Sequence, residues 1–141
     1  NTVEMGRSVL ARYGSHRAGI ALYGDAAGMQ RSTAGKSDYA LLAEMGFNEQ
    51  RLRKANPFVK DRVNAVNAML ENTSGERRLF HHPRCVELRK DFETVEWKDD
   101  GLVIDKSKKE RTHATDAIGY FIEYEYSLTQ HRRDPAKRFY K

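Results

Sequence analysis

The feature that most constrains the fold is a short apolar run that stops at an acid, in the segment 19–28 (GIALYGDAAG). Ile20, Leu22 and Tyr23 form the run, and Asp25 follows after one glycine. A continuous apolar run is typical of a strand that is buried on both faces of a sheet. Open sheets place their chemistry at the carboxyl ends of such strands. Asp25 is therefore a candidate site residue, although an aspartate here could equally well only start a turn.

Apolar periodicity predicts the elements around this strand. Helical spacing and capping residues predict helices over 2–13, 38–45, 57–71 and 84–93, and a last helix that Thr112 or Thr115 caps and that ends near Tyr126. Runs bounded by turn residues predict strands over 19–24, 50–54 and 78–82, and a hairpin over 94–105 around the Asp-Gly pair at 100–101. Strands that alternate with helices indicate an α/β sheet flanked by helices, with one added hairpin.

Two of these helices carry specific expectations. Asn56 is a good N-cap residue and Pro57 suits a first helical position, so the third helix is expected to begin there. In the fourth helix, Cys85 falls on the apolar face with Leu88 and Phe92. The apolar face of the third helix is expected to consist of Val59, Val63, Val66 and Leu70.

Positive charge is concentrated toward the end of the chain. The formal net charge is +5, and residues 131–141 hold five of the 25 Lys and Arg residues but one of the 20 Asp and Glu residues. A second basic cluster spans 106–111 (KSKKER). Such segments on a nearly neutral body suggest a polyanion held at defined places, although short charge runs are commonly only solvated loops. We therefore expect a domain over 1–128 and a mobile basic tail over 129–141.

Composition and spacing exclude several classes of protein. No apolar run approaches the roughly 18 residues of a membrane-spanning helix, and a single cysteine excludes an internal disulfide. The Gly-Lys-Ser triplet at 35–37 resembles the end of a phosphate-binding loop, but Gln30 stands where that loop needs its first glycine. His81, His82 and Cys85 do not suffice for structural zinc, which takes four ligands, usually in paired spacing.

Asp116 is the second candidate acid, in the first turn of the last predicted helix. An aspartate there favours the helix dipole by about 0.3–1 kcal/mol, which alone would explain it. If it instead meets Asp25 at the strand end, two carboxylates form a hard-oxygen site for Mg²⁺ or Mn²⁺. We expect the two carboxylates to lie within roughly 4–8 Å of each other. His113 is a candidate second-shell donor, and Glu123 is a weaker third acid.

Five segments resemble, in order, the nuclease domain of tailed-bacteriophage terminase large subunits, the DNA-packaging motor: ALYGDAAG, GKSDYALLAEMGF, NPFVKDRVNAVNAML, RRLFHHPRC and DKSKKERTHATDAIGYFIEYEY. The resemblance covers residues 18 to about 126. It implies a fold similar to ribonuclease H, in which three clustered acids bind two divalent metal ions, Mg²⁺ or Mn²⁺. It further implies that Asp25 is the second acid and Asp116 the third.

The resemblance also implies a function: a metal-dependent endonuclease that cuts double-stranded viral DNA during genome packaging. The expected partners are DNA, the portal protein and the small terminase subunit, in the cytoplasm of the infected bacterial host and without a membrane. The tail would engage the portal. Phosphate contacts position DNA without reading its sequence, and four basic residues are expected to make them: Lys106, Lys108, Lys109 and Arg111.

One feature departs from the family pattern. The first acid belongs on an earlier, central strand, but only 24 residues precede Asp25, and Glu4 lies in a helical pattern. We therefore expect the first acid, the opening strands and an ATPase domain to lie in a longer polypeptide, and the present chain alone to be inactive. Two alternatives stay open: another ribonuclease H-like nuclease such as a junction resolvase, and a non-catalytic module for DNA binding or assembly.

Overall fold

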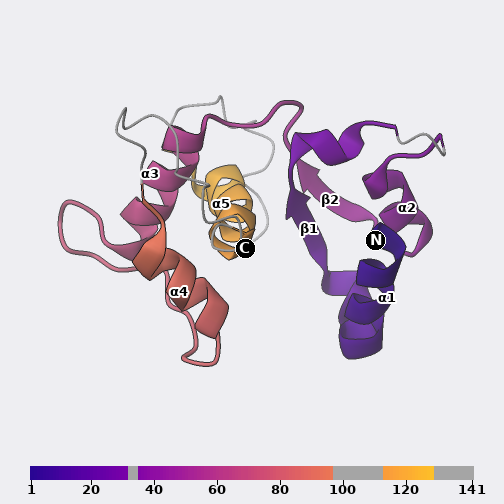
Figure 1. The fold of residues 1–141 in the computed structure, drawn as a ribbon, viewed down its shortest axis with the longest axis horizontal. Helices are drawn as coiled ribbons and strands as arrows, with labels where there is room; N and C mark the ends of the chain where they lie inside the picture. Colours follow the sequence, from indigo (N-terminus) through magenta and orange to yellow (C-terminus); the bar gives the residue numbers. More distant parts are fainter. Residues whose placement is uncertain (32–34, 97–112, 129–141) are drawn as a thin grey trace. The chain divides into compact units, whose positions relative to one another are not determined.

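A computed structural model describes residues 1–31, 35–96 and 113–128. The chain divides into two compact units, Asn1–Asn56 and Pro57–Lys141, which we call the first and the second unit (Figure 1). Each unit is described by itself. Within the described ranges, no helix combines the length and the apolar character that crossing a bilayer requires.

The first unit is built around a parallel pair of strands. Its elements are α1 (Thr2–Tyr13), the 3₁₀ turn η1 (Gly14–Gly19), β1 (Ala21–Gly24), the 3₁₀ turn η2 (Ala26–Met29), α2 (Asp38–Glu44) and β2 (Glu49–Leu52). The strands β1 and β2 pair in parallel, from Ala21 opposite Glu49 to Gly24 opposite Leu52. Parallel neighbours need a crossover connection, and α2 provides it.

Helix α1 packs on α2 through a glycine. A Cβ atom on Gly6 would lie 2.7 Å from Cε of Met45, which is closer than side-chain atoms approach in folded proteins. The missing side chain therefore lets α1 lie directly against Leu42 and Met45. Among the residues of this unit that the structure describes, the buried apolar side chains are Leu42 and Phe47. Close packing at this contact holds α1 against α2, and α2 also packs on η2, the turn that follows the first candidate acid.

The second unit is helical in its described part. It contains α3 (Val59–Leu70), α4 (Val86–Thr94) and α5 (His113–Tyr126), and both α3 and α4 pack against α5. Four buried side chains form its core: Ala65, Val66, Met69 and Ile122. Helix α5 is thus the element on which this unit is assembled, and it carries the second candidate acid.

The predicted helices and the strands over 19–24 and 50–54 are confirmed, but α3 begins at Val59 rather than at Pro57. Asn56 does not cap it, because its side chain bonds to Asp25 and to the Ala26 backbone instead. Phe58 occupies the N-cap position without a side-chain hydrogen bond. The expected apolar face is confirmed only in part: Val66 is buried and Leu70 packs against the core. The other buried residues of α3 are Arg62, Ala65 and Met69 rather than Val59 and Val63.

The strand predicted over 78–82 is wrong. The backbone N–H groups of Arg78 and Leu79 both donate to the carbonyl oxygen of Met69, at 2.9 and 2.8 Å. The segment therefore folds back onto the end of α3 rather than joining a sheet. Cys85 was also misassigned, because it lies at the N-cap of α4 and is exposed rather than on an apolar face.

Three sequence expectations lie outside the described residues in whole or in part. Most of the hairpin predicted over 94–105 does, although its first residue, Thr94, belongs to α4 rather than to a strand. The basic cluster over 106–111 and the tail over 129–141 fall there entirely. The boundary at residue 128 therefore stays a prediction.

Candidate active site

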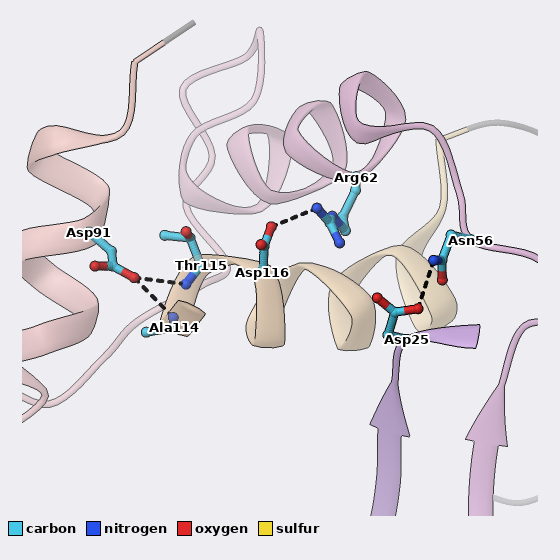
Figure 2. Close-up of polar contacts among 7 residues, drawn as sticks. All are labelled: Asp25, Asn56, Arg62, Asp91, Ala114, Thr115 and Asp116. Carbon is cyan, nitrogen blue, oxygen red and sulfur yellow. Dashed lines mark hydrogen bonds and ion pairs between the residues drawn. The ribbon is translucent and has the colours of Figure 1, made fainter. Parts of the chain in front are cut away.

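Asp25 lies directly after β1 and begins a turn, as the simpler of its two interpretations predicts. Its side chain caps η2 by accepting from the backbone N–H of Ala27, with 2.7 Å between Oδ1 and N. The same Oδ1 accepts from Nδ2 of Asn56 at 2.7 Å (Figure 2). The Asn56 amide oxygen in turn accepts from the Ala26 N–H at 2.8 Å. Asn56 therefore binds the carboxylate and the backbone of one turn together, which fixes the direction of the Asp25 side chain.

Tyr39 of α2 holds the backbone of the same turn. Its hydroxyl donates to the carbonyl oxygen of Asp25 at 2.8 Å. Gly24 and Gly28 flank the Tyr39 ring, and a Cβ atom on Gly28 would lie 2.7 Å from its Cε2. The small residues after β1 are thus needed for a close approach of side chain to backbone, although the partner is a tyrosine of the chain itself.

Asp116 lies in the first turn of α5 and pairs with an arginine of α3. Arg62 Nη2 donates to Asp116 Oδ1 at 2.6 Å (Figure 2). The Arg62 side chain is 7% exposed and the Asp116 side chain is 22% exposed. A charged side chain is almost never so deeply buried unless it is paired. The pair therefore joins α3 to α5 at a point where Asp116 still reaches the surface.

The start of α5 is capped from α4. Asp91 is 4% exposed, and its Oδ2 accepts from the backbone N–H groups of Ala114 at 2.9 Å and Thr115 at 3.3 Å (Figure 2). These N–H groups have no partner within the helix, since they belong to its first turn. A carboxylate there also complements the positive end of the helix. Asp91 therefore fixes the end of α5 that carries Asp116.

The structure tests only some of the roles that the sequence predicts for the site residues. Asp25 and Asp116 belong to different units, so their approach to each other stays a prediction. His113 is the exposed first residue of α5, and its role as a second-shell donor also stays a prediction. Glu123 is 1% exposed, and its role as a third acid stays a prediction. Four predicted DNA contacts lie outside the described residues: Lys106, Lys108, Lys109 and Arg111.

Structural roles account for the residues that resemble a phosphate-binding loop. Lys36 pairs with Glu44 at 2.6 Å, and Ser37 caps α2 by accepting from the Ala40 N–H at 3.2 Å. Both contacts anchor the start of α2 and use the polar groups that a phosphate would need.

Sequence reasoning missed the residues that hold the two acids, namely Asn56, Arg62 and Asp91. One signal was present for Arg62, which shares a helical face with Ala65, Val66 and Met69. An arginine in such an apolar stripe predicts a buried partner of opposite charge. Nothing comparable pointed to Asn56, because its N-cap interpretation was equally good chemistry.

The donor chemistry of the two acids fits a hard divalent cation. Mg²⁺ is commonly bound by one or two carboxylates together with waters and substrate phosphates, and Mn²⁺ takes the same oxygen ligands. Asp25 and Asp116 each offer such a carboxylate at an end of an element. In the parts of the chain that the structure describes, no three His, Cys, Asp or Glu side chains gather closely enough to hold a metal ion.

The chain was also compared with known proteins. A family model described as a terminase RNaseH-like domain matches residues 2–125. The match extends from the start of α1 into α5 and includes both candidate acids. No curated protein matches the chain, and no solved structure does either.

Proposed function

Because the chain belongs to the terminase RNaseH-like domain family, we propose that it is part of a metal-dependent endonuclease that cuts double-stranded viral DNA during genome packaging. Its α/β fold is of the terminase ribonuclease H-like type. The supporting observation is that the matched region contains two carboxylates, Asp25 and Asp116, each held in a defined direction by a neighbouring side chain. Ligands held in advance avoid the entropy that ordering them on binding would cost.

In this proposal Asp25 and Asp116 hold Mg²⁺ or Mn²⁺ in a common site. Two divalent cations stabilise the charge on the attacking and leaving oxygens of an in-line phosphodiester displacement. Asn56 orients the Asp25 carboxylate, and Tyr39 fixes the backbone beneath it. His113 would donate a hydrogen bond to a carboxylate that holds the metal ion.

Phosphate contacts in the proposal come from the basic cluster that precedes α5: Lys106, Lys108, Lys109 and Arg111. Such contacts neutralise the DNA backbone and carry no sequence information directly. They suit an enzyme that cuts many sequences. The basic tail over 129–141 would engage the portal protein, and the small terminase subunit would be the second protein partner.

Plasmid nicking tests this function in the full polypeptide that contains the chain. Cleavage is expected with Mn²⁺ or Mg²⁺, to stop with EDTA, and to be lost on Asp25→Asn or Asp116→Asn. Asp61→Asn is a matched control, since Asp61 also lies in the first turn of a helix. Full activity in Asp116→Asn would overturn the assignment. Preferential cutting of branched DNA over linear duplex would instead indicate a junction resolvase, and metal-independent binding without cleavage a non-catalytic module.

A further inference from the structure

We propose that Arg62 is a positioning residue, which holds the Asp116 carboxylate in the orientation that a divalent cation requires. The inference rests on the proposed function and adds a residue from α3 to the site. It depends on contacts that Arg62 and Asp91 make with α5, all within the second unit.

The first observation is the geometry of the pair. Arg62 Nη2 approaches one carboxylate oxygen of Asp116, Oδ1, at 2.6 Å. The Arg62 side chain is almost fully buried, whereas the Asp116 side chain is 22% exposed. The arginine therefore approaches Asp116 from the protein interior and constrains the rotation of its carboxylate.

The second observation is that Arg62 is itself held in place. Its guanidinium carbon lies 4.4 Å from the centroid of the Tyr120 ring, within the range of a cation–π contact. Its aliphatic stem crosses α5 at Gly119, where an added Cβ would lie 2.8 Å from Cγ and 2.9 Å from Cδ. Gly119 is a costly residue in a helix interior, and the passage of the Arg62 stem explains why it is there.

The third observation is the anchoring of α5 itself. Asp91 fixes the first turn through Ala114 and Thr115. Arg62 then acts on a carboxylate whose backbone is already held from α4. Together these contacts leave the Asp116 side chain with little freedom before any cation arrives.

Metal-ligating side chains are themselves held by outer hydrogen-bond partners, and loss of such a partner typically lowers metal affinity 10–100-fold. Arg62 is the cation that gives Asp116 this support. A buried positive charge could instead compete with the metal ion for the carboxylate. The two roles predict opposite signs: positioning means that removing Arg62 weakens metal binding, and competition means that it strengthens binding.

The test is a Mn²⁺ titration of the full chain, followed by the electron paramagnetic resonance signal of free Mn²⁺. Arg62→Met removes the guanidinium and keeps an apolar stem. Gly119→Ala retains the guanidinium but forces the Arg62 stem to move. Arg77→Met is the control, since Arg77 forms an exposed ion pair with Glu71 just after α3. We expect a 10–100-fold loss of Mn²⁺ affinity in the first two variants and no change in the control.

Circular dichroism and metal-free melting separate this role from a purely structural one. Alanine is a better helix former than glycine, so Gly119→Ala is expected to keep α5 folded while its Mn²⁺ affinity still falls. If Arg62→Met does not fold, Gly119→Ala alone decides. Unchanged or tighter Mn²⁺ binding in a folded Gly119→Ala variant would overturn the inference.

The Asp116→Asn variant distinguishes failure of the proposed function from failure of the inference about Arg62. If this variant binds Mn²⁺ as the unchanged chain does, the proposed function fails and the inference fails with it. If Asp116→Asn loses Mn²⁺ while Arg62→Met and Gly119→Ala keep full affinity, the metal site stands and only the role of Arg62 is wrong.

Discussion

The two candidate acids are held by opposite means. Asp25, in the first unit, accepts from neutral donors, the Asn56 amide and the Ala27 N–H, at an exposed turn. Asp116, in the second unit, accepts from a buried guanidinium. A hydrogen bond to a charged group contributes about 1.5–3 kcal/mol and less where solvent screens it, as at the Asp25 turn, whereas breaking a buried charge pair costs about 3–5 kcal/mol. The comparison indicates that the orientation of the Asp25 carboxylate depends on a local turn. The orientation of the Asp116 carboxylate depends on the packing of three helices.

The largest expected effect is on the Arg62–Asp116 pair. Arg62→Met is expected to lower the free energy of unfolding by about 3 kcal/mol, because it leaves a partly buried carboxylate without this cation. The double variant Arg62→Met/Asp116→Leu is expected to recover most of that loss, since apolar replacement of both partners can be nearly neutral. Urea unfolding of the two variants measures both values. Equal losses in the single and double variants would mean that the pair is not coupled.

The cap of α5 comes next. Asp91→Ala is expected to cost about 2 kcal/mol, at the upper end of the range for lost caps, because the carboxylate is buried and serves two N–H groups. Glu93→Gln on the exposed part of α4 is the control and is expected to change stability by less than about 0.5 kcal/mol. Thermal melting compares the two. A shift for Asp91→Ala as small as that of the control would remove Asp91 from the account.

A smaller effect is expected at Asp25. Asn56→Ala removes two hydrogen bonds at an exposed turn and is expected to cost about 1 kcal/mol. Asn48→Ala is the control, since Asn48 is exposed. Amide hydrogen exchange should locate the change at Ala26 and Ala27. Unchanged protection at these two amides would show that Asn56 does not hold the turn.

The smallest effect is expected at Lys36. Lys36→Met breaks an ion pair with Glu44 in which both side chains are more than half exposed. Such pairs contribute about 0–1 kcal/mol, so little change in the melting temperature is expected. Neither the unchanged chain nor the variant is expected to bind ATP. Measurable ATP binding that Lys36→Met abolishes would revive the phosphate-loop interpretation.

Most elements of the fold could be predicted from apolar periodicity and caps, as α1, β1 and α2 illustrate. Two of the failures share a physical cause, because each depends on a contact that local sequence patterns do not show. Asn56 has the chemistry of an N-cap residue, yet it bonds to a turn 30 residues earlier in the chain. The segment after α3 has the composition of a strand, yet the N–H groups of Arg78 and Leu79 donate to the carbonyl oxygen of Met69.

The residues of the candidate site also differ in how far the sequence could identify them. The two acids could be selected because an isolated aspartate at a strand end or a helix start has recognisable chemistry. Their partners could not be selected, since Arg62 and Asp91 act through the packing of α3 and α4 on α5. The reason for a glycine at position 119 is visible only in the structure, where the Arg62 stem lies across it.

The most direct test of the central claim is a crystal structure of the full polypeptide grown with Mn²⁺ and measured at a wavelength where manganese scatters anomalously. The account predicts an anomalous peak ligated by a carboxylate oxygen of Asp25 and one of Asp116, with the two carboxylates within roughly 4–8 Å of each other. Carboxylates more than about 12 Å apart, with no peak at either, would contradict it, because no common metal site could then hold both.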